Sequence, residues 1–376
     1  MRVLFFSPYF YPYTSGVTTY PLKILSYLAK KNKITVLTFP LDKQSAINYQ
    51  QLTIVRMPFI FKISKGFISP QSLIYFYKYA KNSDLIILNQ PNFEGLFLAI
   101  IAKIFRKKIV SIFHCQVFLE GNLFIKIINF VLNVSMKTQL YLSDKIVVYT
   151  KDYIDSLSYF KMFIDKTVNI LPPIEKFVPD KKFLSKLLRL KNNNIWIGYA
   201  GRISVEKGLE YLVKTMKQLN NETITLIFAG PYGKVVAGEN NYYLFIQGLL
   251  KKYKLKHIFL GNLSQQQLSA FYKLIDVLVL PSINQTEAFG MVQAEAMING
   301  TPVIASNLPG VRIPIKLTNM GIIVEPKNIN KLSQAIKNIL KNKNKFTNDE
   351  LVKNAEKIFD IKKAYKFYDQ LLTLIN

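Results

Sequence analysis

The stretch that decides the fold is "VLVLPSINQTEAFGMVQAEAMINGTPVIAS", residues 277–306. It opens with an apolar run at 277–280, continues through an Ala-rich segment of helical character, and reaches a second apolar run at 302–305. Two short apolar runs separated by a helical segment predict parallel strands joined by a crossover helix. Two carboxylates, Glu287 and Glu295, lie eight positions apart between these runs.

The spacing of these carboxylates fits poorly with one catalytic centre for glycoside hydrolysis. That chemistry places two carboxylates about 5–9 Å apart, on either side of one bond. On one continuous helix, eight positions separate two residues by about 12 Å along the axis and rotate them off a shared face. Glu287 and Glu295 are therefore better suited to hold the two ends of an extended ligand.

The same alternation of apolar runs and helix-periodic segments extends along the whole chain. In the first half, strands are predicted at residues 3–7, 34–39, 53–57, 85–89, 109–113, 145–149 and 168–171. In the second half, they are predicted at residues 196–200, 224–229, 257–260, 277–280, 302–305 and 321–324. Strands that alternate with helices imply an α/β fold with doubly wound parallel sheets.

The chain is long enough for two domains, because 376 residues exceed the size of one comfortable core. The strand-helix pattern is interrupted between Pro172 and Asn194. We therefore expect an N-terminal Rossmann-like domain at 1–175, a linker at 176–194, a C-terminal Rossmann-like domain at 195–350, and C-terminal helices at 351–376 that pack back toward the first domain. Such sheets bind ligands at the carboxyl ends of their strands, so a site in the cleft between the two facing domains is expected.

Cysteine content and the N-terminus indicate a cytoplasmic setting. Cys115 is the only cysteine, which excludes an internal disulfide. The apolar part of the N-terminus ends at Pro8, too early for a signal sequence. No apolar run reaches the roughly 20 residues that a membrane-spanning helix needs.

The charge balance predicts a negatively charged partner. Lys and Arg number 50 against 23 Asp and Glu, which gives a net charge of +27. Such an excess suits phosphorylated substrates, an anionic membrane surface or nucleic acid. The basic residues are spread along the sequence, without zinc-finger spacing, an RNP motif or basic-region heptads, so nucleic acid is not expected as a partner.

A second segment, "YAGRISVEKGLEYL" at 199–212, begins at the end of the first strand predicted in the second half. Gly201 lets the chain leave that strand tightly, and Arg202 and Lys207 precede a helix that begins near Gly208. Two cations beside the free backbone amides of a helix start form an anion site. The alternative is a solvated loop with a glycine helix cap.

The segment 286–298 allows a similar choice. If Glu287 lies in the loop and the helix begins near Gly290, Glu295 falls in the second turn and can bind vicinal hydroxyls, as a carboxylate binds ribose. The backbone amides that open this helix can face a phosphate; they belong to Phe289, Gly290, Met291 and Val292. In the alternative, Glu287 is an N-terminal helix charge and Glu295 faces solvent.

Together, "GRISVEKG" at 201–208 and "EAFGMVQAEAMINGTPVIAS" at 287–306 resemble the donor site of the family-four glycosyltransferases, which have the two-domain GT-B fold. The Arg-x4-Lys-Gly and Glu-x7-Glu elements occur in the family's order and register, and "GNLSQQQLSAFYKLIDVLVLPS" at 261–282 resembles the family's run into the second motif. The resemblance covers nearly the whole chain. It implies a transferase that uses a nucleotide diphosphate sugar, retains the anomeric configuration and needs neither a cofactor nor an obligatory metal.

The resemblance also implies a role for each matched residue. Arg202 and Lys207 would hold the diphosphate and stabilise its charge as it departs, which is the largest barrier contribution in such a transfer. Glu295 would hold the ribose, and Glu287 the transferred sugar. Gly201 would complete the donor site together with the backbone amides of residues 289–292.

The first half resembles the family in two places. "SPYFYPYTSGVTTY" at 7–20 is similar to an N-terminal loop that usually carries a Gly-Gly pair; Ser15-Gly16 stands here, and Gly16 still permits close approach of a phosphate. "VSIFHCQVF" at 110–118 places His114 at a strand end, where the family has a histidine beside the donor sugar. The alternative for His114 is a structural role. In "NLPGVRIPIK" at 307–316, Arg312 stands in a region where many relatives have an acidic residue.

The segment 56–81 mixes aromatic and basic residues and suits an interface with anionic headgroups. Its candidate contacts are Phe59, Phe61, Lys62, Lys65, Phe67, Lys78 and Lys81. The alternative is an ordinary loop and helix with its aromatic residues in the core.

The sequence therefore predicts a retaining glycosyltransferase with a nucleotide-sugar donor and a lipid-linked glycan or glycolipid acceptor. We expect it to be peripheral on the cytoplasmic face of the membrane. One alternative is a sugar-nucleotide epimerase of the same fold, which would use carboxylates of the first half as acid and base; Glu94 and Glu120 stand there in no recognisable motif. The other is a non-enzymatic basic protein that binds membrane or nucleic acid with an affinity that falls steeply with salt.

Overall fold

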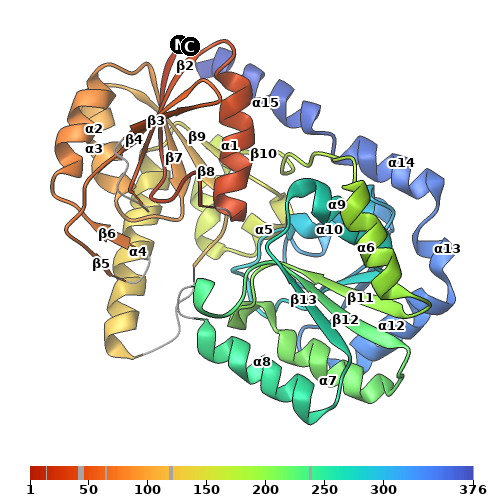
Figure 1. Cartoon of the computed structure of the whole chain (residues 1–376). Helices are drawn as coiled ribbons and strands as arrows, with labels where there is room; N and C mark the ends of the chain where they lie inside the picture. The colour runs from red at the N-terminus through yellow and green to blue at the C-terminus, as the bar shows by residue number, and fades with distance from the viewer. Residues whose placement is uncertain (14, 41–45, 64–65, 118–121, 237–238, 376) are drawn as a thin grey trace. The chain divides into compact units, whose positions relative to one another are not determined.

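The computed structural model describes residues 1–375 except 14, 41–45, 64–65, 118–121 and 237–238 (Figure 1). The described chain forms two compact units. Unit 1 consists of Met1–Pro173 and Ile361–Asn376, and unit 2 of Ile174–Asp360.

Unit 1 is built on an eight-stranded sheet with the order β10-β9-β8-β7-β1-β2-β4-β3. Its strands are β1 (Arg2–Phe6), β2 (Lys33–Thr38), β3 (Ala46–Tyr49), β4 (Leu52–Arg56), β7 (Leu85–Gln90), β8 (Lys108–Phe113), β9 (Lys145–Val148) and β10 (Thr167–Asn169). All neighbouring strands are parallel except β3 and β4. Chain order reverses between β1 and β7, which makes their carboxyl ends a topological switch point.

The helices of unit 1 are α1 (Gly16–Leu28), α2 (Ser72–Lys81), α3 (Gly95–Ile104), α4 (Leu123–Leu142), α5 (Lys151–Asp155) and α15 (Ile361–Ile375). A small antiparallel hairpin, β5 (Phe61–Ile63) and β6 (Gly66–Ile68), lies apart from the main sheet. A 3-10 helix at Ser158–Lys166 follows α5.

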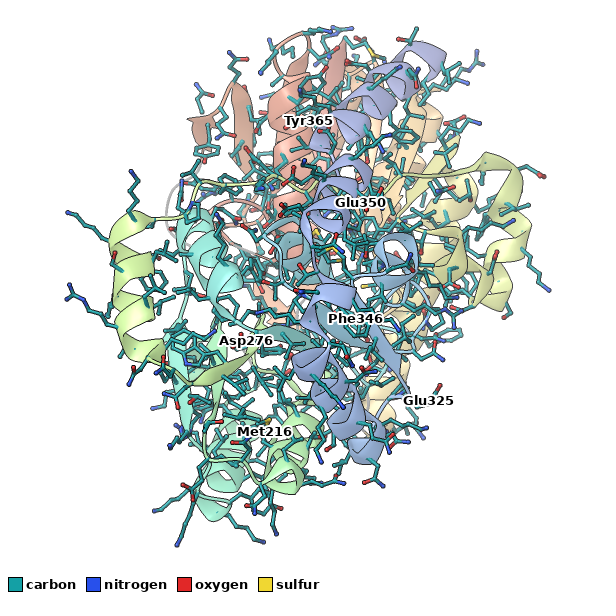
Figure 2. All side chains as sticks on the ribbon, turned by 90° about the vertical axis from the view of Figure 1, so that its right-hand side faces the viewer. Met216, Asp276, Glu325, Phe346, Glu350 and Tyr365 are labelled. Carbon is teal, nitrogen blue, oxygen red and sulfur yellow. The ribbon has the colours of Figure 1, made fainter. Side chains whose placement is uncertain are left out.

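Helix α15 joins unit 1 by packing against α1. The hydroxyls of Tyr20 and Tyr368 are 2.7 Å apart and buried. The Tyr365 ring (Figure 2) stacks on the Tyr27 ring at a centroid distance of 4.0 Å. The Tyr27 hydroxyl also donates to Asp369 Oδ2 at 2.6 Å. These contacts tie the last described helix to the first helix of the chain.

Unit 2 is built on a six-stranded parallel sheet with the order β13-β12-β11-β14-β15-β16. Its strands are β11 (Ile195–Ala200), β12 (Ile224–Ala229), β13 (His257–Gly261), β14 (Val277–Leu280), β15 (Val303–Ser306) and β16 (Gly321–Val324). In order along the unit this is the 3-2-1-4-5-6 arrangement of Rossmann folds, with the switch point between β11 and β14. Phe346 and Met216, labelled in Figure 2, belong to the apolar core on one face of this sheet.

The helices of unit 2 are α6 (Lys181–Lys191), α7 (Leu209–Leu219), α8 (Asn240–Lys252), α9 (Gln265–Leu274), α10 (Met291–Ile298), α11 (Ile313–Thr318), α12 (Ile329–Lys341), α13 (Lys343–Phe346) and α14 (Asp349–Ile358). The apolar positions of α7 explain its orientation. Leu209, Leu212, Val213 and Met216 recur at helical spacing, and all four are buried in the core of unit 2.

All thirteen predicted strands occur, each to within two residues at either end. Strands β3, β5 and β6 were not predicted. The expected linker at 176–194 is instead largely folded into unit 2, because Asp180 caps α6 by accepting from the Phe183 amide at 2.9 Å and α6 packs against α9. The expected C-terminal segment at 351–376 divides at 360/361, because α14 packs against α10 and α11 within unit 2.

Within the described ranges, no helix is long and apolar enough to cross a membrane.

Candidate functional site

Two glycines shape the chain where β11 ends. Gly201 has φ +137 and donates its amide to the Ala229 carbonyl at 2.8 Å. Gly230, with φ +127, follows β12, and a Cβ placed on it would lie 2.3 Å from the Gly201 carbonyl oxygen. Because L-residues with a Cβ rarely adopt such φ values, this close approach depends on glycine. The loop after β11 is thus held against the loop after β12.

Arg202, the first cation of the site, follows Gly201 directly. Its Nη2 donates to Glu206 Oε1 at 2.6 Å, and the Ser204 hydroxyl donates to the same oxygen at 2.7 Å. Burial alone would raise the pKa of Glu206, but the Arg202 charge and the Ser204 hydroxyl outweigh it and hold the pKa below its usual value. Tyr199 donates its hydroxyl to the Arg202 carbonyl at 2.7 Å and so fixes the backbone here.

The loops that follow β11 and β14 touch each other through Gly208. This residue has φ +61 and separates a 3-10 turn at Val205–Lys207 from α7. A Cβ on Gly208 would lie 2.5 Å from the Pro281 carbonyl oxygen. The Ile283 amide donates to the Glu206 carbonyl at 3.0 Å. The loops after β11 and β14 are therefore in direct contact at the switch point of unit 2.

Lys207 and Glu287 form an ion pair across these two loops. Lys207 Nζ donates to Glu287 Oε2, and the Ser282 hydroxyl lies 3.5 Å from the same oxygen. The two side chains are only 18% and 14% exposed. Burial, and then the charges of Glu287 and Glu206, raise the pKa of Tyr199 well above its usual value. Two ion pairs, Arg202–Glu206 and Lys207–Glu287, therefore lie in the loops at this end of the sheet.

Helix α10 begins beside this ion pair. Gly290 caps it with φ +73, and a Cβ there would lie 2.4 Å from Leu280 Cδ2. The buried Gln293 side chain donates to the Phe289 carbonyl and the Val311 carbonyl, both at 2.9 Å. The N-terminus of α10 is therefore held rigidly. A helix N-terminus carries partial positive charge and amides without intrahelical acceptors, which favours an anion.

Glu295 lies in the second turn of α10, as the sequence predicts. The buried Tyr272 on α9 donates its hydroxyl to Glu295 Oε2 at 2.8 Å. Burial, and then Glu295, raise the pKa of Tyr272 well above its usual value. Glu295 is therefore half-buried and held by Tyr272, unlike a fully exposed surface carboxylate.

Gly16 and His114 belong to unit 1. Gly16 begins α1, with Ser15 as its cap, and the side-chain Nδ2 of Asn89 donates to the Val17 carbonyl at 2.9 Å. His114 follows β8 and is buried, and its Nε2 lies 2.6 Å from Asn89 Oδ1. Because an amide oxygen only accepts, Nε2 carries the proton and Nδ1 accepts from the Tyr149 hydroxyl. Burial lowers the pKa of His114 to about 3.

The structure thus brings most predicted site residues together at the switch point of unit 2. They are Gly201, Arg202, Lys207, Glu287, Phe289, Gly290, Met291, Val292 and Glu295. In unit 1, Asn89 connects His114 to Val17, the residue that follows Gly16. The residues that sequence reasoning missed are Glu206, Tyr272, Ser282 and Gln293. Glu206 stands inside the quoted motif, next to Lys207, but an acidic side chain gave no sign that it would pair with the arginine four positions earlier.

Arg312 lies at the start of α11, with Nη1 donating to Asn307 Oδ1 at 3.2 Å. Among the residues that the structure describes, no cluster of three or more His, Cys, Asp or Glu side chains could hold a metal ion.

The chain is similar to known proteins in sequence and in structure. Residues 180–358 match the model of the family described as glycosyl transferases, group 1. An uncharacterized glycosyltransferase of Methanocaldococcus jannaschii is 35% identical over 145 residues, which is 38% of this chain and 35% of that protein. D-inositol 3-phosphate glycosyltransferase of Xylanimonas cellulosilytica is 29% identical over 154 residues, 41% of this chain and 36% of that protein. The match spans about a third of the length of these curated relatives.

Solved structures resemble the chain over nearly its whole length. Sucrose-phosphate synthase from Thermosynechococcus elongatus has a TM-score of 0.78 at 19% identity, with 99% of each chain covered. HepE of Anabaena, in complex with UDP-glucose, has a TM-score of 0.79 at 19% identity, also with 99% of each chain covered. The two-unit α/β fold is therefore GT-B, as the sequence predicts. The matched residues 180–358 make up nearly all of unit 2, so the similarity to the group 1 glycosyl transferases lies in this unit.

Proposed function

We propose that this protein transfers a sugar from a nucleotide diphosphate sugar to an acceptor, with retention at the anomeric carbon and without a cofactor or obligatory metal. One observation carries the proposal: Lys207 pairs with Glu287 across the two loops at the switch point of a Rossmann sheet, beside the N-terminus of α10, and Arg202 pairs with Glu206 in the first of these loops. Ligands of such sheets bind at this place. The relatives named above are glycosyltransferases, and HepE was solved with UDP-glucose.

The diphosphate has matching groups in this site. Arg202 and Lys207 supply charged N–H donors, and the start of α10 supplies backbone amides and the positive end of a helix dipole. Charge grows on the diphosphate as the sugar leaves, so preorganised donors lower the barrier more than they strengthen ground-state binding. Pairing with Glu206 and Glu287 holds both cations in place before the donor arrives.

The two carboxylates suit the two ends of the donor. Glu287 lies in a loop beside Lys207, so its partner would be the sugar joined to the diphosphate. Glu295 lies one turn into α10, held by Tyr272, so its partner would be the ribose at the far end. This division accounts for the spacing of eight positions, because one residue is in the loop and the other is in the helix.

His114 has a more limited role in this proposal. Its Nε2–H is engaged by Asn89, its Nδ1 accepts from Tyr149, and burial keeps the ring neutral by lowering its pKa. A histidine in this state is a poor proton acceptor. We assign His114 to orienting the polypeptide after β8 beside the sugar, with Gly16 allowing close approach of the donor at the start of α1.

For the acceptor we propose a lipid-linked glycan or glycolipid, with the enzyme peripheral on the cytoplasmic face of the membrane. The net charge of +27 favours an anionic surface. Similar proteins include a lipopolysaccharide 1,2-N-acetylglucosaminetransferase of Salmonella typhimurium and a capsular polysaccharide biosynthesis glycosyltransferase of Staphylococcus aureus.

The epimerase alternative is disfavoured by the setting of Glu94. This residue is buried and accepts from the Phe67 amide at 2.8 Å and the Phe93 amide at 3.2 Å, so its carboxylate is a structural acceptor. Glu120 lies outside the described residues.

Donor binding provides the test. A panel of nucleoside diphosphates and nucleotide sugars should contain at least one compound that stabilises the protein in thermal unfolding, since a ligand at 100 times its Kd adds about 2.7 kcal/mol. Arg202→Ala should abolish that shift, measured against the variant's own unliganded transition, which should fall because Glu206 loses its cation. If no compound of the panel raises the transition temperature, the proposed donor class is wrong. If a nucleotide sugar stabilised the protein but the protein released no sugar from it, a binding protein would be favoured instead.

A further inference from the structure

The N-terminal half of α4 is attached to unit 1 without being buried in it. Every residue of 122–134 is at least partly exposed to solvent. The buried residues of α4 are Ser135, Met136, Gln139 and Leu140, all in its C-terminal half. A helix that projects in this way normally carries polar side chains on its free surface.

The free surface of α4 is apolar instead. Its exposed large side chains are Leu123, Phe124, Ile127, Phe130, Val131, Val134 and Tyr141. Leu123, Ile127, Phe130, Val134 and Tyr141 follow one another at intervals of four, three, four and seven positions, which places them in one stripe along the helix. We call these seven residues the α4 face.

Neighbouring helices extend the apolar surface. Helix α2 packs against α3, and α3 against α4, so the three form one layer (Figure 1). Leu73, Ile74 and Tyr77 of α2 are exposed, and so are Phe97, Ile100 and Ile104 of α3. Leu73 and Ile74 lie four and three positions before Tyr77, and the three positions of α3 follow at intervals of three and four, so each helix turns an apolar stripe outward. Monomeric proteins rarely leave so many apolar side chains exposed on adjacent elements unless a partner covers them.

The charges on this layer have one sign. The sequences of α2, α3 and α4 contain no Asp or Glu. Their charged residues are Lys78, Lys81, Lys103, Lys126 and Lys137. Lys126 and Lys137 are exposed on α4, within three or four positions of residues of the α4 face. Apolar stripes flanked by lysines match the interface of an anionic bilayer, where apolar side chains enter the acyl boundary and ammonium groups meet the headgroups.

We propose that the α4 face, extended by the exposed stripes of α2 and α3, docks this protein on an anionic lipid bilayer. The inference deepens the proposed membrane association by naming its surface, and it does not require the sugar-transfer chemistry. Helix α4 lies along the interface in this arrangement, with Lys126 and Lys137 at headgroup level.

This surface differs from the one that the sequence suggests at 56–81. Phe67 of that segment is buried, and Lys62 Nζ lies 4.5 Å from the centroid of its ring and 5.3 Å from that of Phe59. An aromatic contact does not by itself separate the two surfaces, because Lys137 Nζ of α4 lies 4.7 Å from the centroid of the Tyr159 ring; the burial of Phe67 does separate them. Lys65 lies outside the described residues. Phe61, Lys78 and Lys81 are exposed, and the two lysines belong to the α2 end of the layer.

The test uses the full chain and co-sedimentation with vesicles, without donor or acceptor. Wild-type protein should sediment with vesicles of phosphatidylcholine plus phosphatidylglycerol at low salt, and much less with phosphatidylcholine alone. The variant Ile127→Glu/Phe130→Glu should weaken binding at least about tenfold, because it removes two apolar side chains that enter the bilayer and adds negative charge that the anionic surface repels. The control, Leu244→Glu/Phe245→Glu, makes the same change at two exposed apolar positions of α8 in unit 2 and should bind as the wild type does.

A second variant tests the charge contribution independently of the apolar one. Lys126→Glu/Lys137→Glu should lower binding to the anionic vesicles at least about tenfold, since each basic residue near such a surface contributes about a factor of five. All variants should unfold at the wild-type temperature, because the changed side chains are exposed.

Each contrary result has its own meaning. If wild-type protein did not sediment with anionic vesicles at low salt, both the membrane association and the proposed docking surface would be overturned. Sugar transfer to a soluble acceptor would stand. Wild-type binding that survives both α4 variants but is lost in Lys78→Glu/Lys81→Glu would overturn the α4 face alone. A wild-type dimer in analytical ultracentrifugation that Ile127→Glu/Phe130→Glu converts to monomer would show that a second copy covers this surface.

Discussion

The Lys207–Glu287 ion pair allows the structural and the functional value of one contact to be separated. Lys207→Met leaves a carboxylate that is 14% exposed without its cation. Breaking a fully buried pair costs about 3–5 kcal/mol. Partial solvent access at both side chains reduces this, so we expect a loss of about 2 kcal/mol in the free energy of unfolding.

Neutralising the partner should restore that loss. In Lys207→Met/Glu287→Gln, no uncompensated charge stays behind, so the free energy of unfolding should return to within about 1 kcal/mol of the wild type. Activity should not return with it. Loss of a preorganised cation on the departing diphosphate costs about 2–4 kcal/mol, or roughly 30- to 1000-fold in kcat.

The measurements are urea unfolding for stability and steady-state sugar transfer for kcat, on the wild type, both single variants and the double variant. Glu287→Gln serves as the matched control, because it leaves Lys207 charged and able to donate to the amide oxygen. If the double variant regained both stability and wild-type turnover, the pair would be a structural salt bridge only. The assignment of Lys207 to the diphosphate would then be refuted.

The other predictions concern single residues. Glu295→Ala should raise the Kd for the nucleotide by about 10- to 100-fold with little change in kcat, because ribose contacts are equal in ground and transition states; an unchanged Kd in titration calorimetry would contradict the ribose role. Burial raises the pKa of Glu94 from 4.5 to about 7, so the folded state holds this proton more tightly than the unfolded state, and its contribution to stability is complete below pH 4.5 and lost as pH rises through 7. In full, that loss is worth about 3 kcal/mol in the free energy of unfolding, and Glu94→Gln should not show it. Urea unfolding of the wild type and the variant at pH 5 and pH 8 measures the difference, and parallel pH profiles for the two proteins would disprove it. Gly208→Ala should destabilise by at least about 2 kcal/mol, because a φ of +61 and a Cβ at 2.5 Å from the Pro281 carbonyl oxygen both oppose it, whereas Gly248→Ala in α8, with open space around it, should be neutral or stabilising. Thermal unfolding of the two glycine variants decides this last case, and equal stability would refute the close approach.

The strands were predictable because parallel strands covered on both faces consist of almost uninterrupted apolar runs. Runs such as 224–229 and 277–280 are buried at every position. The missed hairpin of β5 and β6 has three residues in each strand, too few for any periodicity to show. Helix α6 was missed because Leu187 is its one buried residue, so its charged sequence resembled a linker.

The order of the motifs was enough to propose candidate site residues, whereas their pairing could not be predicted. Lys207 and Glu287 are 80 positions apart and meet only because β11 and β14 are neighbours in the sheet, an order that the local sequence does not encode. The same holds for His114, whose neutral, doubly engaged ring depends on Asn89 and Tyr149 from two other strand ends. The boundary at 360/361 likewise depends on tertiary contacts of α15.

The return of α15 to unit 1 constrains the order in which the protein can fold during synthesis. Unit 2 is continuous in sequence and lies between the two segments of unit 1. When residues 1–173 leave the ribosome, Tyr20 on α1 still lacks Tyr368, which is made almost 200 residues later. Unit 2 can complete its core first, while the nascent unit 1 exposes an uncovered aromatic surface on α1 for the whole translation of unit 2. Binding sites for a chaperone are thus expected on the early intermediate and not on the finished chain.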